Sequence, residues 1–293
     1  MGMFSNLSYD TQRKIIIISF SMVPVILLVT FSFLPVFDMI RYSFTDWNGI
    51  SKDYDYVGFD NYMAIFTEQR YFTVFKVSLY YFLATFVQFG LALYFATILS
   101  FRVRGKNFFK GVLFFPYLLN GVAIGFIFLY FFRPDGTLDT VLQFIGLGDY
   151  VQKWLGNPDI INLSLAGTSV WRYMGFNFVI FLGAIMSISG DIYEASEIDG
   201  ANRWHQFKHI IIPSIKKIIL LNLILAVSGA ISVFEIPYIM TGGSNGSGTF
   251  VIQTVDVAFK FNKVGLGSAM AVVLMLIVVV ITLIQKRAFK EED

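Results

Sequence analysis

The chain has 293 residues, of which 56% are hydrophobic and only 14% carry a charge. A water-soluble domain cannot bury that much apolar surface, so most of the chain is expected to lie in lipid. The sequence contains no Cys, which excludes disulfide bonds, cysteine-based metal sites and a thiol nucleophile. The net charge of +2 gives no indication of nucleic-acid binding, so the positions of the charges matter more than their sum.

Six apolar segments are long enough to cross a hydrocarbon layer of roughly 30 Å, which takes about 20 helical residues. The first segment follows two basic residues, as a signal peptide would, but it is too long, contains two prolines and lacks a small-residue cleavage site. We therefore interpret it as an uncleaved span. The predicted fold is all-α, a single polytopic membrane domain over residues 1–293 with six transmembrane helices. They are expected near residues 15–37, 74–99, 111–132, 164–188, 218–240 and 265–284.

The distribution of Lys and Arg predicts the orientation of these spans. Thirteen basic residues fall in short segments on one side of the membrane. Eight fall in longer loops on the other side, and the first two of those loops also hold ten acidic residues. Because short cytoplasmic loops are enriched in Lys and Arg, both termini and the polar segment 189–217 are predicted to be cytoplasmic. On the outer side, the aromatic stretches 42–49 and 57–62 are typical of structure at the lipid head groups.

The segment 189–217 is a polar island between two apolar segments, and its pattern predicts two short helices that meet at a bend. Asp191 is a good N-cap, and Glu194 stands three residues later, as in a capping box. Gly200 can take the positive φ that a turn between the helices requires. An apolar face at helical spacing is expected on the second helix. Its members are Trp204, Phe207, Ile211 and Ile215.

Two other motifs resemble ligand sites, but no site is predicted at either. His205 and His209 have zinc-compatible spacing, but no carboxylate lies between them as in the metalloprotease motif, so no metal site is expected. Residues 242–248 are rich in glycine, but no Lys-Ser/Thr follows them and they would lie outside, so a hinge or packed turn is expected. The chain holds no Gly-x4-Gly-Lys-Ser/Thr motif, so no phosphate-binding loop of that type is expected on it.

Two charged residues within the predicted spans, Arg172 and Glu235, are expected at similar depth in the outer half of the membrane. A charge near the bilayer centre costs on the order of 2.5 to 3.5 kcal/mol, so neither should face lipid. They either pair with each other or line an aqueous cavity, and the two arrangements are compatible. Aromatic and hydrogen-bonding neighbours suit a polyhydroxylated ligand such as a sugar. The candidate substrate pathway is Trp171, Arg172, Tyr173, Asn177, Glu235 and Tyr238.

Residues 194–213 resemble the Glu-Ala-Ala loop of binding-protein-dependent ATP-binding-cassette importer permeases. The matching positions are Glu194, Ala195, Gly200, Ile210 and Pro213, whereas Ser196 and Ile212 depart from the motif. The sequence Asp199-Gly-Ala, with Phe207 after it, is similar to the carbohydrate branch of that family. The early Trp-Asn-Gly and Asn-Tyr elements resemble the first of the two unlike permeases in maltose- and glycerol-phosphate-type systems.

The resemblance implies a non-hydrolytic permease subunit in the plasma membrane of a bacterium or archaeon, which imports sugars or oligosaccharides by alternating access. Its partners would be a second, homologous permease, two cytoplasmic ATPase subunits that bind ATP and Mg, an external solute-binding protein and the sugar itself. No cofactor is expected on this chain. The loop would act as a coupling helix that docks on an ATPase. The expected coupling residues are Glu194, Ala195, Ser196, Asp199, Gly200 and Ala201.

Two other functions remain open at this point. The first is an ion- or proton-coupled secondary transporter that uses Glu235 as the coupling carboxylate. Such transporters commonly show inverted repeats and discontinuous helices. No convincing repeat is visible in this sequence. The second is a membrane anchor without transport activity, for which the region around Arg172 and Glu235 would be dispensable.

Overall fold

A computed structural model of the protein describes residues 8–101 and 103–290. In this part of the chain the only β-structure is an isolated antiparallel bridge between Thr45 and Tyr56. Five helical segments are long and apolar enough to cross a membrane, and a bent helix pair would make a sixth. These findings confirm the predicted all-α membrane fold. The exact number of spans and the side on which the termini lie stay predictions.

The described residues form two compact units, one of residues 8–67 with 254–273 and one of residues 68–253 with 274–290. The first unit begins with a helical stretch of 34 residues in which no side chain is buried. The aromatic loop after it is well ordered, because Asn61 Nδ2 donates hydrogen bonds to the carbonyls of Ser43, at 2.9 Å, and Thr45, at 2.8 Å. The elements of this unit are α1 (Tyr9–Leu28), η1 (Val29–Phe33), α2 (Leu34–Tyr42), α3 (Asp60–Thr67), η4 (Asp256–Lys260) and the start of α15 (Val264–Lys290).

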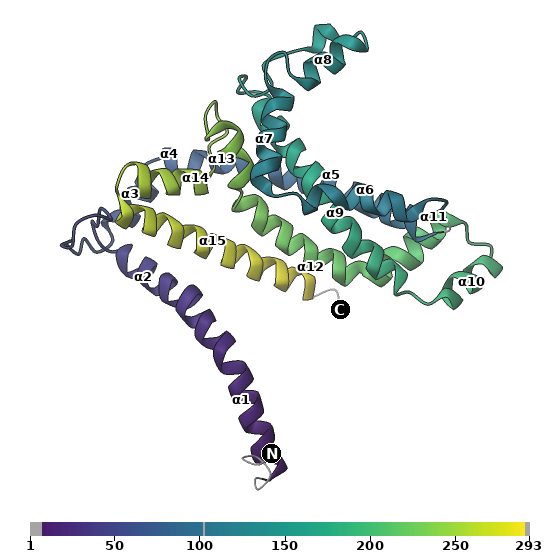
Figure 1. Cartoon of the computed structure of the whole chain (residues 1–293), viewed down its shortest axis with the longest axis horizontal. Helices are drawn as coiled ribbons and strands as arrows, with labels where there is room; N and C mark the ends of the chain where they lie inside the picture. Colours follow the sequence, from purple (N-terminus) through teal and green to yellow (C-terminus); the bar gives the residue numbers. More distant parts are fainter. Residues whose placement is uncertain (1–7, 102, 291–293) are drawn as a thin grey trace, which may run out of the picture. The chain divides into compact units, whose positions relative to one another are not determined.

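In the second unit, α5, α9 and α12 lie side by side, with α10 and α11 at one end and α13 at the other (Figure 1). This arrangement connects one end of the three-helix group to the polar segment that the sequence singled out. The elements are α4 (Arg70–Thr73), α5 (Phe75–Ser100), α6 (Lys106–Leu118), α7 (Gly121–Phe132), α8 (Thr137–Phe144), η2 (Gly148–Tyr150), α9 (Ile161–Met186), α10 (Gly190–Ile198), α11 (Arg203–Gln206), η3 (Phe207–Ile211), α12 (Ile212–Ile231) and α13 (Glu235–Thr241). The short helix α14 (Phe250–Val255) follows them.

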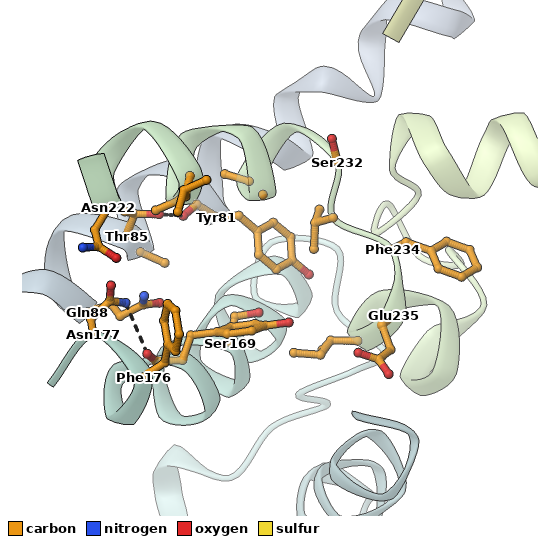
Figure 2. A pocket seen from close by; sticks show the side chains of 18 residues that line it. Tyr81, Thr85, Gln88, Ser169, Phe176, Asn177, Asn222, Ser232, Phe234 and Glu235 are labelled. Atoms are coloured by element: carbon orange, nitrogen blue, oxygen red, sulfur yellow. Dashed lines mark hydrogen bonds between the residues drawn. The ribbon is translucent and has the colours of Figure 1, made fainter. Parts of the chain in front are cut away.

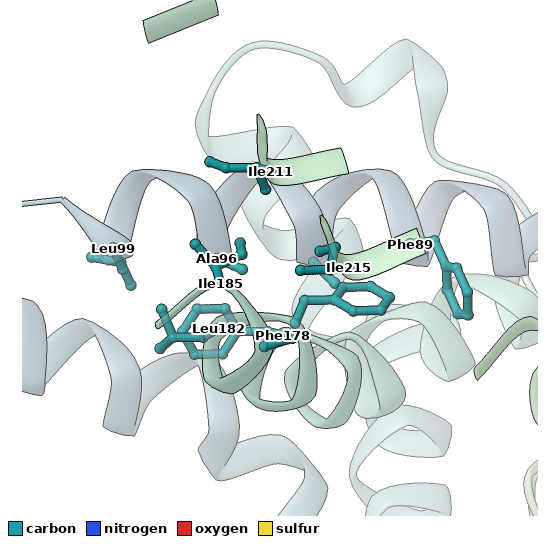
Figure 3. Close-up of a cluster of buried hydrophobic side chains, with 11 residues drawn as sticks. Phe89, Ala96, Leu99, Phe178, Leu182, Ile185, Ile211 and Ile215 are labelled. Atoms are coloured by element: carbon teal, nitrogen blue, oxygen red, sulfur yellow. The ribbon is translucent and has the colours of Figure 1, made fainter. Parts of the chain in front are cut away.

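Two clusters of buried apolar side chains hold α5, α9 and α12 together. The first lies toward α10 and α11, and Figure 3 shows Phe89, Phe178 and Ile215 packing within it. The second lies toward α13 and includes Tyr81, Leu165 and Ile236. Along each of the three helices, the segment between the two clusters carries polar side chains. The apolar pattern of the spans is therefore interrupted at one common level.

The predicted span 111–132 is not one straight helix. It is divided between α6 and α7, which meet at an angle of 97°. Pro116 in the last turn of α6 has no N–H, and Asn120 begins α7 by accepting a hydrogen bond from the Val122 N–H at 2.8 Å. The predicted span 218–240 is also interrupted, because the helix breaks between Ile231 and Glu235. Apolar composition alone does not reveal these breaks.

Close packing around the bent pair depends on three glycines. A Cβ atom on Gly121 would overlap the Glu235 carboxylate, and a Cβ on Gly125 would overlap Ile239. Two glycines four residues apart on α7 thus contact Glu235 and Ile239, which are four residues apart on α13. On α9, a Cβ on Gly175 would overlap the main chain of Leu113 in α6. Small residues allow this close helix approach, as is usual in membrane proteins.

The glycine-rich segment 242–248 is a packed turn, as predicted. Asn162 Nδ2 donates to the Gly246 carbonyl at 3.1 Å, and Asn245 Nδ2 donates to the Leu155 carbonyl at 3.0 Å. Gly242 takes φ +59° at the end of α13, a conformation that favours glycine. The turn therefore fixes the chain after α13 against the start of α9.

Candidate functional site: a polar pocket and a bent loop

A pocket of about 430 Å³ lies among α5, α9, α12 and the break before α13 (Figure 2). It occupies the level between the two apolar clusters, and its walls combine aliphatic and aromatic side chains with a few polar ones. Such a lining is typical of small-molecule sites, in which a small number of polar groups fix the ligand. The polar members are Tyr81, Thr85, Gln88, Ser169, Tyr173, Asn177, Asn222, Ser232 and Glu235.

The polar groups are unevenly distributed within the pocket. The amides of Gln88, Asn177 and Asn222 gather at one end, and Glu235 lies at the other (Figure 2). Asn177 and Asn222 each donate from Nδ2 to the carbonyl four residues earlier, at 3.2 and 2.9 Å, which fixes their orientation. The pocket therefore has an uncharged, amide-rich end and an acidic end.

Two buried hydroxyl groups that line the pocket, those of Tyr81 and Ser169, make no hydrogen bond within the described part of the chain. Nearly all buried polar side-chain atoms in proteins have a hydrogen-bond partner. These two hydroxyls therefore lie in the pocket wall with unused hydrogen-bonding capacity.

Arg172 and Glu235 form an ion pair, as one of the two arrangements predicted. Arg172 Nη1 lies 2.5 Å from Glu235 Oε2. The Arg172 side chain is 12% exposed and its guanidinium lies 5.0 Å from the centre of the Tyr173 ring, whereas the Glu235 side chain is 41% exposed and lines the pocket. Arg172 and Glu235 therefore pair with each other, and Glu235 is the member of the pair that also lines the pocket.

The predicted pathway residues divide into two groups. Tyr173, Asn177 and Glu235 line the pocket, but Trp171, Arg172 and Tyr238 do not. Ser169, Tyr173, Phe176 and Asn177 share one face of α9, and two residues along a helix correspond to a turn of about 200°, which directs Trp171 away from them. Its ring packs edge-on against Phe128, with 5.1 Å between centroids, and Tyr238 stacks on Phe234 at 4.7 Å.

Several lining residues escaped the sequence reasoning, among them Tyr81, Thr85, Gln88, Ser169 and Asn222. Gln88 and Asn222 did carry a signal. Each is an amide near the middle of an apolar span, where polar side chains usually face the interior of the helix bundle or a cavity. Ser169 and Thr85 carried no such signal, because Ser and Thr hydroxyls can bond to the backbone of their own helix. Tyr81 carried no such signal either.

The bent loop is present in segment 189–217, but its first helix starts earlier than predicted. Ser189, rather than Asp191, is the N-cap of α10, and its Oγ accepts a hydrogen bond from the Asp191 N–H at 3.3 Å. Glu194 is therefore an exposed residue within the helix and not the second member of a capping box. The predicted turn is confirmed, since Gly200 has φ +81°. Asn202 then caps α11 by accepting from the His205 N–H at 2.9 Å.

Side-chain hydrogen bonds fix the two helices of the loop relative to each other. Gln206, which is buried, donates from Nε2 to Ser196 Oγ at 3.1 Å and accepts from Arg203 Nη1 at 3.2 Å. The Arg203 guanidinium also lies 4.0 Å from the centre of the Phe101 ring, at the end of α5. These contacts join the two helices of the loop to each other and to the end of α5.

One surface of the loop stays uncovered. Of the expected coupling residues, Glu194, Ala195, Asp199 and Gly200 are exposed, and Ser196 and Ala201 are half-buried. Of the four members of the predicted apolar face, Ile211 and Ile215 are buried, Phe207 is half-buried and Trp204 is 66% exposed. Trp204 stacks on Phe207, with 5.5 Å between centroids. Together with Ile198, which is 87% exposed, it presents apolar surface beside the polar residues.

Residues 88–290 match the family model described as "Binding-protein-dependent transport system inner membrane component". The probable ABC transporter permease protein YurN of Bacillus subtilis is 30% identical over 251 residues, which cover 83% of this chain and 86% of that protein. The multiple sugar-binding transport system permease protein MsmF of Streptococcus mutans is 28% identical, over 93% of this chain and 94% of that protein. The arabinooligosaccharides transport system permease protein AraP of Bacillus subtilis is 29% identical, over 81% and 78%.

The fold also matches a solved structure, the crystal structure of a bacterial ABC transporter involved in the import of the acidic polysaccharide alginate. The TM-score is 0.83 and the sequence identity is 19%, over 96% of this chain and 97% of that chain. At this level of identity the match establishes a shared helical fold.

Proposed function

Because this chain belongs to the family of binding-protein-dependent transport system inner membrane components, we propose that it is the membrane-spanning subunit of an ATP-driven importer of sugars or oligosaccharides. The main observation in support of this function is that the same two helices line the pocket and flank the loop. Asn177 lies on α9 and Asn222 on α12, and these two helices flank the α10–α11 loop. A rigid-body movement of the loop would therefore be transmitted directly to the walls of the pocket.

The chemistry of the pocket supports a sugar as substrate. Amide and hydroxyl groups can bond to the hydroxyls of a sugar, and the rings of Tyr173 and Phe176 offer apolar faces to its C–H groups. The relatives named for multiple sugars and for arabinooligosaccharides agree with this substrate class. Substrate contact is proposed for Tyr173, Asn177 and Glu235, and for the newly found Gln88 and Asn222.

We assign coupling to the exposed surface of the loop. Glu194, Ala195, Asp199 and Gly200 would contact a groove of a cytoplasmic ATPase, with Ile198 and Trp204 supplying the apolar part of the interface. ATP and Mg would bind to two such ATPase subunits. A second permease and an external solute-binding protein would complete the importer. This assignment requires six spans, with both termini and the loop in the cytoplasm, in a single permease domain.

The experiment is uptake of radiolabelled sugar by cells that express the complete importer, with membrane levels measured in parallel. Gly200→Pro and Glu194→Lys should abolish uptake without loss of protein from the membrane, because they destroy the turn and invert the charge of the docking surface. Gly190→Pro is a matched control, since Gly190 is the first residue of α10, where proline is well tolerated. Normal uptake by both loop variants would contradict the coupling function.

An ATPase-inactive partner separates this function from an ion-coupled transporter that uses Glu235. Our proposal expects uptake to stop with such a partner. Uptake that persisted, and that collapsed with an uncoupler, would favour secondary transport. A membrane anchor without transport activity would show no change in uptake when Arg172 and Glu235 are replaced.

A further inference from the structure

The pocket presents one kind of charge to a solute. Of the described residues that line it, only Glu235 carries a charged side chain. Its positive partner, Arg172, is 12% exposed and does not line the pocket. The ion pair is therefore one-sided: it has no net charge, but the member that a solute meets is the carboxylate.

Two features of the structure place positive potential beside the Glu235 carboxylate. Arg172 holds Oε2 at 2.5 Å, and the carboxylate lies against Gly121 in the first turn of the twelve-residue helix α7. A nearby cation and the N-terminal end of a helix both favour a negative charge. The acidic end of the pocket therefore lies between the Arg172 guanidinium and the first turn of α7.

None of the other described residues that line the pocket carries a positive charge that could bind an anion. Sites that bind carboxylate or phosphate groups use Arg, Lys or several converging N–H donors. Here the amides of Gln88, Asn177 and Asn222 lie at the far end of the pocket from Glu235, and two of them already donate to their own helices (Figure 2). The lining suits hydroxyl groups better than ionised ones.

We propose that this pocket takes uncharged glycans and that Glu235 is a specificity determinant that excludes glycans bearing carboxylate or phosphate groups. The proposal rests on the function proposed above and names its substrate class. The fold leaves this choice open, since a similar fold occurs in a transporter of an acidic polysaccharide. The charge preference therefore has to come from side chains such as Glu235.

Because the chain has no Cys, a single cysteine can report the electrostatic potential of the pocket. Ser169→Cys places a thiol at a pocket-lining hydroxyl that makes no hydrogen bond to any described residue. Its thiolate attacks a methanethiosulfonate reagent, forms a mixed disulfide and releases methanesulfinate. Rates are measured for an anionic sulfonatoethyl, a cationic trimethylammonioethyl and a neutral ethyl reagent, in the assembled importer without nucleotide or sugar. Mass spectrometry of this chain's own peptide excludes signals from the other subunits.

The readout is the ratio of the cationic to the anionic rate at Ser169→Cys, divided by the same ratio at the exposed position Ser214→Cys. We expect this normalised ratio to be well above one. Adding Glu235→Gln should lower it by about 10-fold, because one unit of negative charge is removed from the pocket wall. Asp159→Asn removes an exposed carboxylate outside the pocket and should leave the ratio unchanged.

A double variant guards against misfolding, because Glu235→Gln alone leaves Arg172 without its partner. Arg172→Gln/Glu235→Gln removes both charges and should also abolish the preference for the cation. An unchanged ratio in both variants would overturn the proposal, and so would failure of the neutral reagent to label Ser169→Cys, since the pocket would then be closed to solutes. The labelling needs neither ATP nor sugar, so its outcome is independent of the uptake experiment that tests the proposed function.

Discussion

The Arg172 guanidinium on α9 lies 2.5 Å from the Glu235 carboxylate at the start of α13, and so joins two elements that are 63 residues apart in the chain. We expect Arg172→Gln and Glu235→Gln each to lower the free energy of unfolding by about 1–3 kcal/mol, because each leaves one charge without its partner in a largely apolar region. The double variant should lose clearly less than the sum of the two. Thermal unfolding of the wild-type protein, the two single variants and the double variant, each purified in detergent, measures these differences.

The exposed pair of Arg70 and Glu68, also at 2.5 Å, is the control for this prediction. Glu68→Gln should leave the unfolding temperature unchanged, because water screens an exposed pair. Strictly additive effects of the Arg172 and Glu235 substitutions would contradict a stabilising pair.

The contacts around the glycines predict that Gly→Ala substitutions at different positions change stability in opposite directions. Gly125→Ala and Gly175→Ala should each destabilise the protein by about 1–3 kcal/mol, because the added methyl group overlaps Ile239 or the Leu113 main chain. Gly183→Ala should be neutral or stabilise the protein by up to about 1 kcal/mol, because its Cβ would lie more than 4 Å from the rest of the described structure beyond its own helix backbone, and alanine favours helix. Unfolding temperatures of the three variants test this, and equal shifts would contradict the packing.

The hydrogen bonds of Gln206 predict that sugar uptake can be uncoupled from ATP hydrolysis without any change in the pocket. Gln206→Leu keeps the size of a buried side chain but removes its hydrogen bonds to Ser196 and Arg203. We expect uptake to fall several-fold while ATP hydrolysis by the assembled importer continues, because the helices of the loop are no longer held together. Gln152→Leu, at an exposed position outside the loop, is the control. Unchanged sugar uptake per ATP hydrolysed would show that this link is not needed.

Tyr193 in the loop predicts a small effect of alkaline pH on stability. Burial raises the pKa of Tyr193, and its hydroxyl makes no hydrogen bond within the described chain. Because the folded pKa lies above the unfolded value of about 10, the stability contribution is fully present below that pH and is lost as the pH rises through the folded pKa. Tyr193→Phe should therefore unfold as wild type does at pH 7 and retain more stability than wild type at about pH 11.

Unfolding by denaturant at the two pH values measures this difference. Tyr150→Phe removes a hydroxyl from an exposed tyrosine and serves as the control. A marked loss of stability in Tyr193→Phe at neutral pH would show that the hydroxyl has a bonding partner in the protein.

Much of this architecture could be predicted from the sequence because the physical signals are local. Long apolar segments specify membrane helices wherever they pack, and the turn at Gly200 follows from the conformational freedom of glycine. The pairing of Arg172 with Glu235 could be anticipated as one of two arrangements, because an isolated charge in the membrane is costly. The bent loop could be recognised from its own residues, although its first helix begins at Ser189 rather than Asp191.

Only the tertiary structure decided where the pocket lies and which side chains face it. Trp171, Arg172 and Tyr173 are adjacent in sequence, but the rotation of the helix directs only Tyr173 into the pocket. The contribution of Gln88 and Asn222 depends on α5, α9 and α12 meeting at one level, which no local pattern encodes. The packing of Gly121 and Gly125 against α13 is likewise a long-range contact, whereas Pro116 and Asn120 mark the 97° bend between α6 and α7 locally. Local sequence determined the helices, and contacts between distant residues determined the pocket.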